Sequence, residues 1–372
     1  MTSAAVHEPQ TPKPGRFLEL DGLRGIAAVS VVVYHYGLSY NSFYPDDPPP
    51  LVDFPWGRYG VQLFFLVSGF VILMTARRAK RPSDFAISRL SRLYPAYWIA
   101  LTISIIVSIA FRVPHTDVGW TARIMNYTMV QRLLLFPNVD EVYWTLAIEM
   151  QFYILVMALL VIPRCRVTTR RVLIAGALWL TLSLVLSVVL GGASRGVSPQ
   201  NVVTPVKMLL NILVVEWGPL FVTGMLAHLA RDDRRLRPAA LGSGVVALAV
   251  TALLHGWQEP IPLVVVLAIF FVVVLRPSTP LLLLRPFQFY GRISYSLYIG
   301  NVVTGNALTH LLVTAVGRTV ATVATFVAVT LFAMALHRVG EEWGSRRART
   351  LLLRLRAMWD GARSTRSGSI RA

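Results

Sequence analysis

A histidine and an arginine stand on one apolar stretch of this chain. Residues 20–40 read LDGLRGIAAVSVVVYHYGLSY, which is long and apolar enough to cross a bilayer, yet it contains Arg24 near its start and His35 deep inside. A helix rises about 1.5 Å per residue, so these two side chains share one face roughly 16 Å apart along the axis. An ionisable group at membrane depth costs on the order of 2.5–3.5 kcal/mol and is usually kept inside a bundle or beside a water-filled cavity. We therefore interpret this segment as one wall of an active site.

His35 suits general base catalysis, because a neutral imidazole can lie uncharged in a membrane interior and still accept a proton near neutral pH. A purely structural hydrogen bond is the alternative. In VYWTLAIEMQFY, Glu149 and Tyr153 stand four residues apart on one helix face below Trp144, which we assign to the outer aromatic belt. Counted from opposite sides, Tyr153 and His35 reach similar depth. We therefore expect Glu149 to contact His35 or an arginine, the alternative being a structural link between two helices.

Two further segments supply candidate binding residues. Ser68 and Gly69, near the centre of YGVQLFFLVSGFVILM, permit close approach of either a neighbouring helix or a slender substrate. Arg89 and Arg92 stand three residues apart in SRLSRLYPAYW, a spacing that suits an anionic, phosphate-bearing ligand at the cytoplasmic mouth. Ordinary anchoring at the inner membrane surface is the alternative explanation for this pair.

The composition is that of a membrane protein. Of the 372 residues 55% are hydrophobic, and the net charge of +18 sits in short clusters between apolar runs. No aromatic-plus-basic motif of a nucleic-acid-binding module is present, so we expect no nucleic-acid partner. A single cysteine excludes an internal disulfide and a multi-cysteine metal site, and we expect no bound metal.

Apolar runs of roughly 17–25 residues predict an all-α bundle of about ten transmembrane helices. They are 21–40, 58–76, 93–111, 143–162, 172–190, 206–228, 239–255, 260–275, 293–312 and 319–337. The loops alternate in basic content, and one set, together with the two terminal tails, carries most of the 36 Lys and Arg residues. By the positive-inside rule, both termini are cytoplasmic. A cytoplasmic (inner) membrane location follows.

Three segments lie outside the expected spans. Residues 1–17 are polar and lack a leading basic-plus-apolar signal pattern, which predicts a disordered tail. Residues 344–372 form a basic cytoplasmic tail, which we expect to be an amphipathic helix on an anionic membrane surface or else unstructured. The partly amphipathic 112–142 segment is expected to be a re-entrant or interfacial helix that caps the site from outside.

Six motifs, taken together and in this order, resemble acyltransferase family 3, the multi-span membrane O-acyltransferases of the O-antigen, exopolysaccharide and macrolide type. They are LDGLRGIAAVSVVVYH, LFFLVSGFVI, SRLSRLYPAYW, WTLAIEMQFY, GRISYSLYIGN and HRVGEEW. They extend over residues 18–343, which we assign to one membrane acyltransferase domain. The resemblance implies a ten-helix bundle that takes an acyl group from cytoplasmic acyl-CoA and esterifies a hydroxyl, often on a sugar.

The resemblance also implies roles for individual residues. It points to Arg24 and His35 as the essential pair and to four pocket residues, Arg89, Arg92, Glu149 and Tyr153. Two departures from relatives occur: Asn301 stands where many have a histidine, and the triplet at 341–343 is Glu-Glu-Trp where many have Glu-(Lys/Arg)-Pro. Both concern substrate choice and neither affects the pair in the first span.

We therefore expect an O-acyltransferase with His35 as general base or transient acyl carrier and Glu149 orienting it. Arg24, Arg89 and Arg92 would hold the CoA phosphates or orient the thioester. Substrate or CoA binding is further assigned to Ser68, Tyr153, Trp144 and Asn301. Acyl-CoA, above all acetyl-CoA, is the expected co-substrate with no bound cofactor. The expected acceptor is a hydroxyl-bearing sugar, a lipid-linked glycan or a macrolide-type molecule, with membrane lipid around the bundle.

The alternative is a transporter or flippase in which Arg24, His35 and Glu149 form a substrate or proton path. The chain shows neither repeated halves nor a matched pair of Gly/Pro-broken spans, and this favours the enzyme. A receptor or scaffold would leave the buried polar residues without a purpose. Arginine outnumbers lysine, which indicates a GC-rich bacterial genome.

Overall fold

The computed structural model describes residues 17–50, 52–161, 167–194 and 211–369. Within these ranges every regular element is helical, as the sequence predicts. The expected tail over 1–17 lies outside the described residues except for Phe17, and so does the start of the expected span 206–228.

The elements follow one another along the chain as α-helices joined by short 3-10 and π helices, both labelled η; η1 and η7 are the π helices. They are α1 (Leu18–Tyr34), η1 (His35–Ser39), α2 (Tyr40–Phe43), η2 (Pro55–Tyr59), α3 (Gly60–Arg78), α4 (Pro82–Ala110), α5 (Trp120–Asn126), η3 (Gln131–Leu134), α6 (Tyr143–Val161), α7 (Thr169–Ser194), α9 (Gly218–Asp232), η5 (Arg234–Leu236), α10 (Arg237–His255), α11 (Pro260–Leu275), η6 (Pro280–Leu283), α12 (Arg285–Ile299), α13 (Val302–Val316), α14 (Arg318–Leu336), η7 (His337–Gly344) and α15 (Ser345–Ser369).

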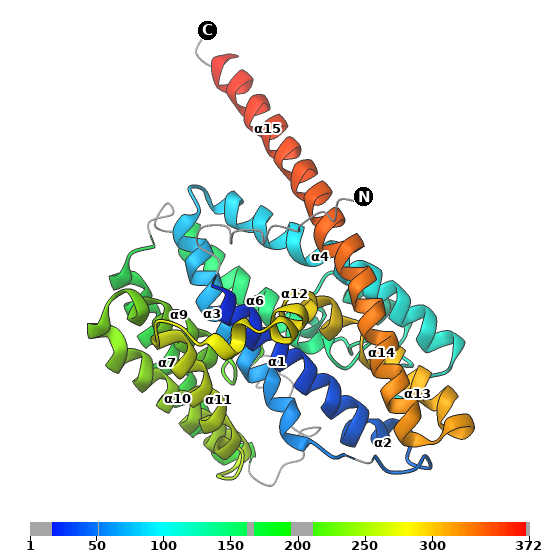
Figure 1. Ribbon diagram of the computed structural model, residues 1–372. Coiled ribbons are helices and arrows are strands. Elements are labelled where there is room, and N and C mark those ends of the chain that lie inside the picture. The colour runs from blue at the N-terminus through cyan, green and yellow to red at the C-terminus, as the bar shows by residue number, and fades with distance from the viewer. Residues whose placement is uncertain (1–16, 51, 162–166, 195–210, 370–372) are drawn as a thin grey trace, which may run out of the picture.

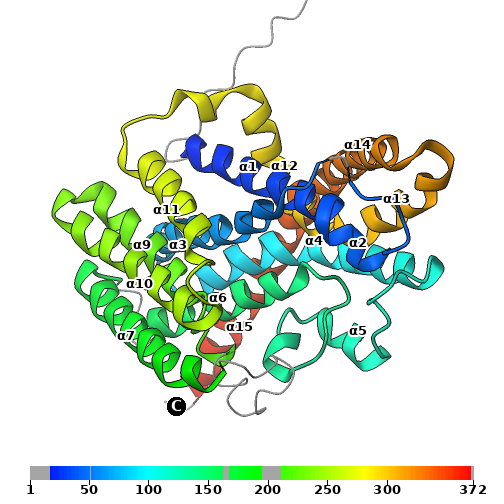
Figure 2. The ribbon, with the colours of Figure 1, turned by 90° about the horizontal axis from the view of Figure 1, so that it is seen from below.

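Helices α1 and α3 run through the middle of the bundle. Figures 1 and 2 show α7, α9, α10 and α11 on one side of them and α13 and α14 on the other. Two glycine contacts allow the backbones to approach closely: a β-carbon at Gly291 of α12 would overlap the Asp21 carbonyl oxygen of α1, and one at Gly69 of α3 would overlap the Phe221 carbonyl oxygen of α9. Small residues at helix crossings are typical of membrane bundles.

Side-chain contacts gather the basic loops at one end of the bundle, which we call the basic end. The guanidinium of Arg231, at the end of α9, donates to the Val274 carbonyl oxygen at 2.7 Å and lies 4.0 Å above the Phe17 ring. Gln288 of α12 donates to the Leu18 carbonyl oxygen at 2.8 Å. The ends of α9 and α11 and the starts of α1 and α12 therefore meet, as the alternation of basic loops predicts.

The other set of loops meets at the opposite end. Arg58 of η2 pairs with Glu259 before α11 at 2.8 Å, and His310 of α13 pairs with Asp47 at 2.9 Å. The two loop sets identified from their basic content thus correspond to two physical ends of the molecule.

The expected count of ten spans is only partly matched. By length and composition, six described helices are able to cross a membrane, or seven if α12 and α13 form one span. Three expected spans are shorter or more polar: α1 carries Glu19, Asp21 and Arg24 in its first turns, α9 has 15 residues within the described chain, and α11 has 16. The expected span 293–312 is not one straight helix, because α12 and α13 meet at 85° around Asn301.

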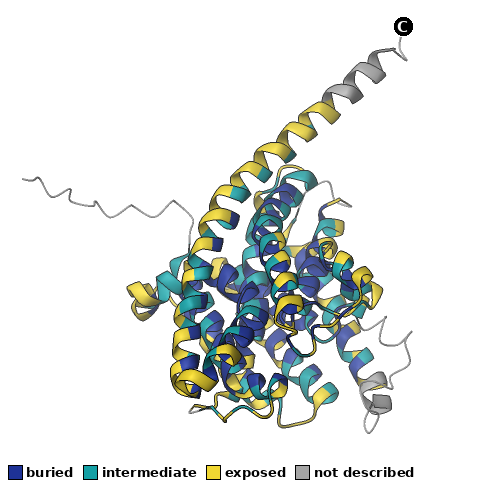
Figure 3. Cartoon of the chain, turned by 90° about the vertical axis from the view of Figure 1, so that its right-hand side faces the viewer, coloured by how far each residue is buried: buried dark blue, intermediate teal, exposed yellow. Residues whose placement is uncertain are grey.

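The expected membrane domain (18–343) and basic tail (344–372) are joined by continuous helix. Helix α14 continues through the π helix η7 into α15, so that the chain is helical without interruption from Arg318 to Ser369. Figure 3 shows α15 leaving the bundle with most of its described surface exposed. The middle of α15 is tied to the start of α4 by the pairs Arg356–Asp84 and Arg81–Asp360, each formed by one guanidinium and one carboxylate. The expected helical tail is therefore present, as an extension of α14.

Candidate active site

A cavity of about 90 Å³ lies among α1, α3, α4, α6 and α12. We call it the arginine cavity. Its lining includes six of the residues selected from the sequence, namely Arg24, Ser68, Arg89, Arg92, Glu149 and Tyr153. Three helices thus bring three arginines and a carboxylate together, although these residues are far apart in the chain.

The Glu149 carboxylate is held from two sides. Its Oε1 atom accepts a hydrogen bond from the Ser68 hydroxyl at 2.7 Å and another from the Tyr153 hydroxyl at 2.5 Å. The neighbouring Gly69 lets α3 lie close against α9. Of the two small residues at the centre of α3, Gly69 therefore serves helix packing and Ser68 lines the arginine cavity.

Arg89 is almost completely buried beside this carboxylate. Its Nη2 atom donates to the Thr75 hydroxyl at 2.6 Å, while its buried Nε atom has no hydrogen-bond partner within the described chain. Buried donors are nearly always satisfied, so an unpaired guanidinium N–H in a cavity favours an anionic ligand.

A second cavity, of about 400 Å³, reaches the opposite end of the bundle, and we call it the histidine cavity. His35 lines it, together with the charged or polar side chains of Arg58, Glu141, Glu216, His255 and Glu259 and the aromatic rings of Tyr34, Tyr59, Trp144, Trp217 and Tyr298. The structure therefore separates His35 from the three arginines, which the sequence had suggested as parts of one site.

His35 begins the π helix η1, which extends α1, and the residue is 5% exposed. Its Nδ1 atom lies 3.3 Å from the Ser39 hydroxyl oxygen and 3.8 Å from Oε2 of Glu141. The Ser39 hydroxyl in turn donates to the same Glu141 oxygen at 3.4 Å. π turns are often found at functional sites, and this one places His35 and Ser39 on the same side of the chain.

The expected contact between Glu149 and His35 is therefore wrong: the carboxylate next to His35 belongs to Glu141. The reason is depth, because Glu149 lies two helical turns further along α6 and already accepts the hydroxyls of Ser68 and Tyr153. The alternative expectation, that Glu149 contacts an arginine, fits better: Glu149 lines the same cavity as the three arginines, although no direct hydrogen bond or ion pair joins them within the described chain.

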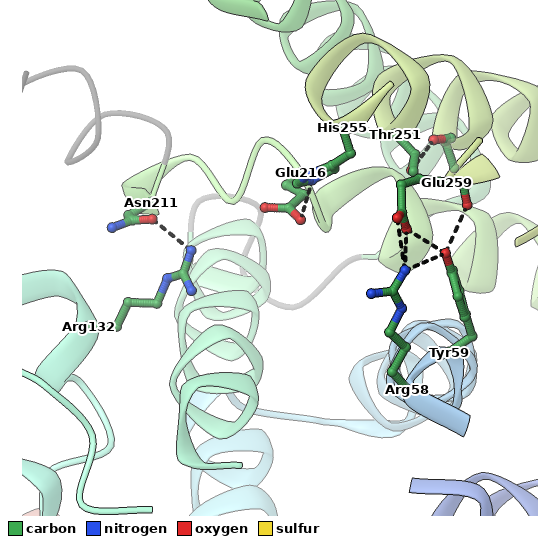
Figure 4. A network of polar contacts seen from close by, with 9 residues as sticks. Arg58, Tyr59, Arg132, Asn211, Glu216, Thr251, His255 and Glu259 are labelled. Atoms are coloured by element: carbon green, nitrogen blue, oxygen red, sulfur yellow. Dashed lines mark hydrogen bonds and ion pairs between the residues drawn. The ribbon is translucent and has the colours of Figure 1, made fainter. Parts of the chain in front are cut away.

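The rim of the histidine cavity is a network of paired charges, shown in Figure 4. Nη2 of Arg58 donates to both carboxylate oxygens of Glu259 at 2.8 and 2.9 Å, and the Tyr59 hydroxyl donates to Glu259 at 2.5 Å. His255 lies 2.8 Å from Glu216. Burial alone would raise the pKa of Glu259. The hydrogen bond from Tyr59 and the positive charge of Arg58 outweigh this effect, so the pKa of Glu259 lies below its ordinary value.

The two cavities share part of their walls. Val61 of α3 and Tyr298 of α12 line both, and the Tyr298 hydroxyl lies 2.8 Å from the hydroxyl of Thr145, which lines the arginine cavity. His35 therefore lines one of two cavities that meet at Val61 and Tyr298, and the arginines line the other.

The remaining predicted residues divide between the site and the scaffold. Trp144 lines the histidine cavity and packs against Trp217, with ring centroids 5.2 Å apart. Asn301 lines neither cavity: it is completely buried at the bend between α12 and α13, where its amide donates to the Tyr298 carbonyl oxygen at 2.6 Å. Helix α5 also lines neither cavity, so the expected cap over 112–142 contributes only Glu141 and Val142.

Several residues of the histidine cavity were not selected from the sequence: Arg58, Tyr59, Glu141, Glu216, His255 and Glu259. A sequence signal existed for some of them. The loops before α3 and before α11 belong to the less basic set and carry opposite charges, and Glu141 lies three residues before Trp144, the first residue of the WTLAIE motif. Among the described residues, no three His, Cys, Asp or Glu side chains lie close enough together to hold a metal ion.

Comparisons with known proteins agree with the resemblance. The family model described as an acyltransferase domain matches residues 17–338. The chain is 28% identical to the peptidoglycan O-acetyltransferase OatA of Listeria monocytogenes over 164 residues, which cover 38% of this chain and 24% of the relative. It is 27% identical to the acyltransferase MdmB of Streptomyces mycarofaciens over 152 residues, 38% of this chain and 39% of the relative.

A third relative is the exopolysaccharide production protein ExoZ of Rhizobium meliloti, 29% identical over 123 residues, 30% of this chain and 37% of the relative. The matched stretches thus cover well under half of each of these relatives. No solved structure matches the chain. Because the family model matches nearly the whole described bundle, and its apolar helices are long enough to cross a bilayer, the chain belongs to the acyltransferase family 3 of membrane enzymes.

Proposed function

We propose that this acyltransferase moves an acetyl or other short acyl group from acyl-CoA to a hydroxyl group of a carbohydrate or glycosylated acceptor. The observation that carries the proposal is the pair of cavities that meet at Val61 and Tyr298. One cavity offers arginines to an anionic donor, and the other offers a histidine to an acceptor.

The donor binds on the side of the arginine cavity. Arg24, Arg89 and Arg92 supply fixed positive charge for the CoA phosphates, and guanidinium groups bind phosphate through paired N–H donors. Glu149 balances this charge, and its bonds to Ser68 and Tyr153 keep it in one place. The thioester then points toward the shared wall.

The acceptor binds on the side of the histidine cavity. Nδ1 of His35 faces Ser39 and Glu141, so a proton on Nδ1 leaves Nε2 free to accept the proton of an acceptor hydroxyl. The oxygen attacks the thioester carbon, the C–S bond breaks, and the CoA sulfur leaves with the proton that His35 returns. Glu141 orients the imidazole and stabilises its protonated form. Because the thioester is already activated, positioning and proton transfer are the main requirements.

A sugar fits the lining of the histidine cavity. Aromatic rings from Trp144, Trp217 and Tyr59 provide flat apolar surfaces, while Glu216 and Glu259 can accept hydroxyl protons. Two relatives carry names that refer to peptidoglycan and to exopolysaccharide production, which supports a carbohydrate acceptor.

The proposed setting is the inner membrane of a bacterium with both termini in the cytoplasm. The basic end of the bundle then faces the cytoplasm, where acyl-CoA is made, and the histidine cavity faces the other side. Transfer across the membrane follows from this orientation.

Membranes of the source organism, which hold the native acceptor, provide the test. Membranes from the parent strain are expected to move radiolabel from acetyl-CoA into an alkali-labile ester of the glycan fraction, and membranes from a deletion strain are expected to lose this label. Equal labelling in both strains would contradict the proposal.

A further inference from the structure

Three side chains from three helices lie where the two cavities meet. Val61 of α3 and Tyr298 of α12 line both of them, and Thr145 of α6 meets Tyr298 through the hydroxyl contact of 2.8 Å. All three are buried, with 9%, 7% and 6% of their surface exposed. The Phe64 ring packs edge-on against Tyr298 with the centroids 5.3 Å apart. We call Val61, Thr145 and Tyr298 the partition.

The partition is tied to the scaffold on both sides. The Thr145 hydroxyl also donates to the Val142 carbonyl oxygen at 2.8 Å, next to Glu141. The Tyr298 carbonyl oxygen accepts the buried Asn301 amide at the bend between α12 and α13. This contact gives Asn301 a positioning role, since it fixes the turn of α12 that carries Tyr298.

We propose that the partition, through Val61 and Tyr298, determines which acyl chains this enzyme transfers. The inference rests on the proposed function, in which the thioester carbon arrives from the arginine cavity and meets an acceptor oxygen beside His35. The reacting carbon then lies at the partition, and every further methylene of the acyl chain must fit against the Val61 side chain and the Tyr298 ring. An acetyl group adds one methyl there, whereas a butyryl group adds two more carbons.

The chain-length preference of the transfer reaction tests this proposal. The test uses purified full-length enzyme in native-lipid vesicles with the glycan-bearing membrane fraction of the deletion strain as acceptor, and compares kcat/KM for acetyl-CoA and butyryl-CoA. Val61→Ala removes two methyl groups from the partition, and Tyr298→Phe removes the hydroxyl that holds the ring to Thr145. We expect the butyryl-to-acetyl ratio to rise about tenfold in Val61→Ala, since one methylene in an apolar pocket changes discrimination by at least that factor, and to rise less in Tyr298→Phe.

Tyr295→Phe is the matched control. Tyr295 lies one helical turn before Tyr298, lines only the arginine cavity and donates its hydroxyl to the Leu93 carbonyl oxygen at 3.0 Å. Loss of the Tyr295 hydroxyl should change kcat/KM for acetyl-CoA and for butyryl-CoA in the same proportion. The butyryl-to-acetyl ratio should therefore stay at the parent value. A purely structural partition would lower both rates without moving the ratio.

The two possible failures are distinguishable. If Val61→Ala and Tyr298→Phe transfer acetyl groups with the parent ratio, the partition does not select the acyl chain, while the proposed function stands. If the parent enzyme transfers neither acyl group, the proposed function itself is wrong. Thermal unfolding of each variant shows that the compared proteins are folded.

Discussion

His35 and Glu141 face each other in the histidine cavity, with Nδ1 of the imidazole 3.8 Å from Oε2 of the carboxylate and the Ser39 hydroxyl between them. Glu149, the carboxylate of the WTLAIEMQFY motif, instead serves the arginine cavity. The two carboxylates therefore have different tasks on the two sides of the partition, and each task predicts a different effect of mutation.

Replacing Glu141 with Gln should lower kcat by about tenfold or more and change the pH profile of kcat, because the protonated imidazole loses its partner. The loss should remain below the roughly 10²–10⁴-fold contributed by a general base itself. Glu216→Gln is the control, since Glu216 lines the same cavity but pairs with His255. It should alter the acceptor KM and leave the pH profile as in the parent. Identical pH profiles in the parent and Glu141→Gln would exclude the orienting role.

Replacing Arg89 with Ala should raise the KM for acyl-CoA by about tenfold or more, because a hydrogen bond to a charged group is worth about 1.5–3 kcal/mol. Arg78→Ala provides the comparison, since Arg78 is exposed at the end of α3 and lines neither cavity. Initial rates at varied acetyl-CoA measure both. If Arg89→Ala and Arg78→Ala raise the KM for acetyl-CoA equally, the donor is attracted by the overall positive charge of the protein and not bound by the arginine cavity.

Gly224→Val should prevent stable packing of α9 against α3. A β-carbon at Gly224 would overlap the Leu66 carbonyl oxygen, and overpacking of a tight interface costs about 1–3 kcal/mol or more. The same change at Gly242 of α10 meets no atom within 4 Å and should be tolerated. Yield and thermal unfolding of the two variants in detergent check this expectation, and equal stability would show that the α3–α9 crossing is not tight.

Asp140 should make stability depend on pH. Burial raises the pKa of this carboxyl group to about 7 from its ordinary 3.8, even though the N–H groups of Val303 and Val142 bond to it. The pKa of Asp140 is higher in the folded state than in the unfolded state. The contribution of Asp140 to the free energy of unfolding is therefore complete below about pH 4 and is lost as the pH rises through about 7. The Tm of Asp140→Asn should therefore vary less with pH over this window than that of the parent, and parallel curves would contradict the assignment.

The sequence predicts the helical class well, because long apolar runs and the alternation of basic loops follow directly from the chemistry of the bilayer. It also predicts which residues line the arginine cavity: Arg24, Arg89, Arg92, Glu149 and Tyr153 stand at recognisable spacings on long apolar helices. The sharp bend at Asn301 was not foreseen, because a continuous apolar run has the same pattern whether its helix is straight or broken.

The partner of His35 could not be found by counting helical depth. That count assumes regular helices, whereas the π turn at His35 and the non-helical Gly37 redirect the chain toward the loop before α6. Depth along an axis also gives no information on which of the two carboxylates, two turns apart, already accepts hydrogen bonds from other side chains. The Glu149 carboxylate already accepts hydrogen bonds from Ser68 and Tyr153. The bond from Ser68 depends on the packing of α3 against α6, which the sequence does not show.

The central claim is that His35, across the partition from the arginines, activates the acceptor. Its most direct test is acyl transfer by His35→Ala, expressed from a plasmid in the deletion strain and assayed with radiolabelled acetyl-CoA in isolated membranes. The account predicts that the variant is present in the membrane at the parent level and that labelling of the glycan fraction falls to the level of the deletion strain. Labelling at the parent rate by His35→Ala would contradict it.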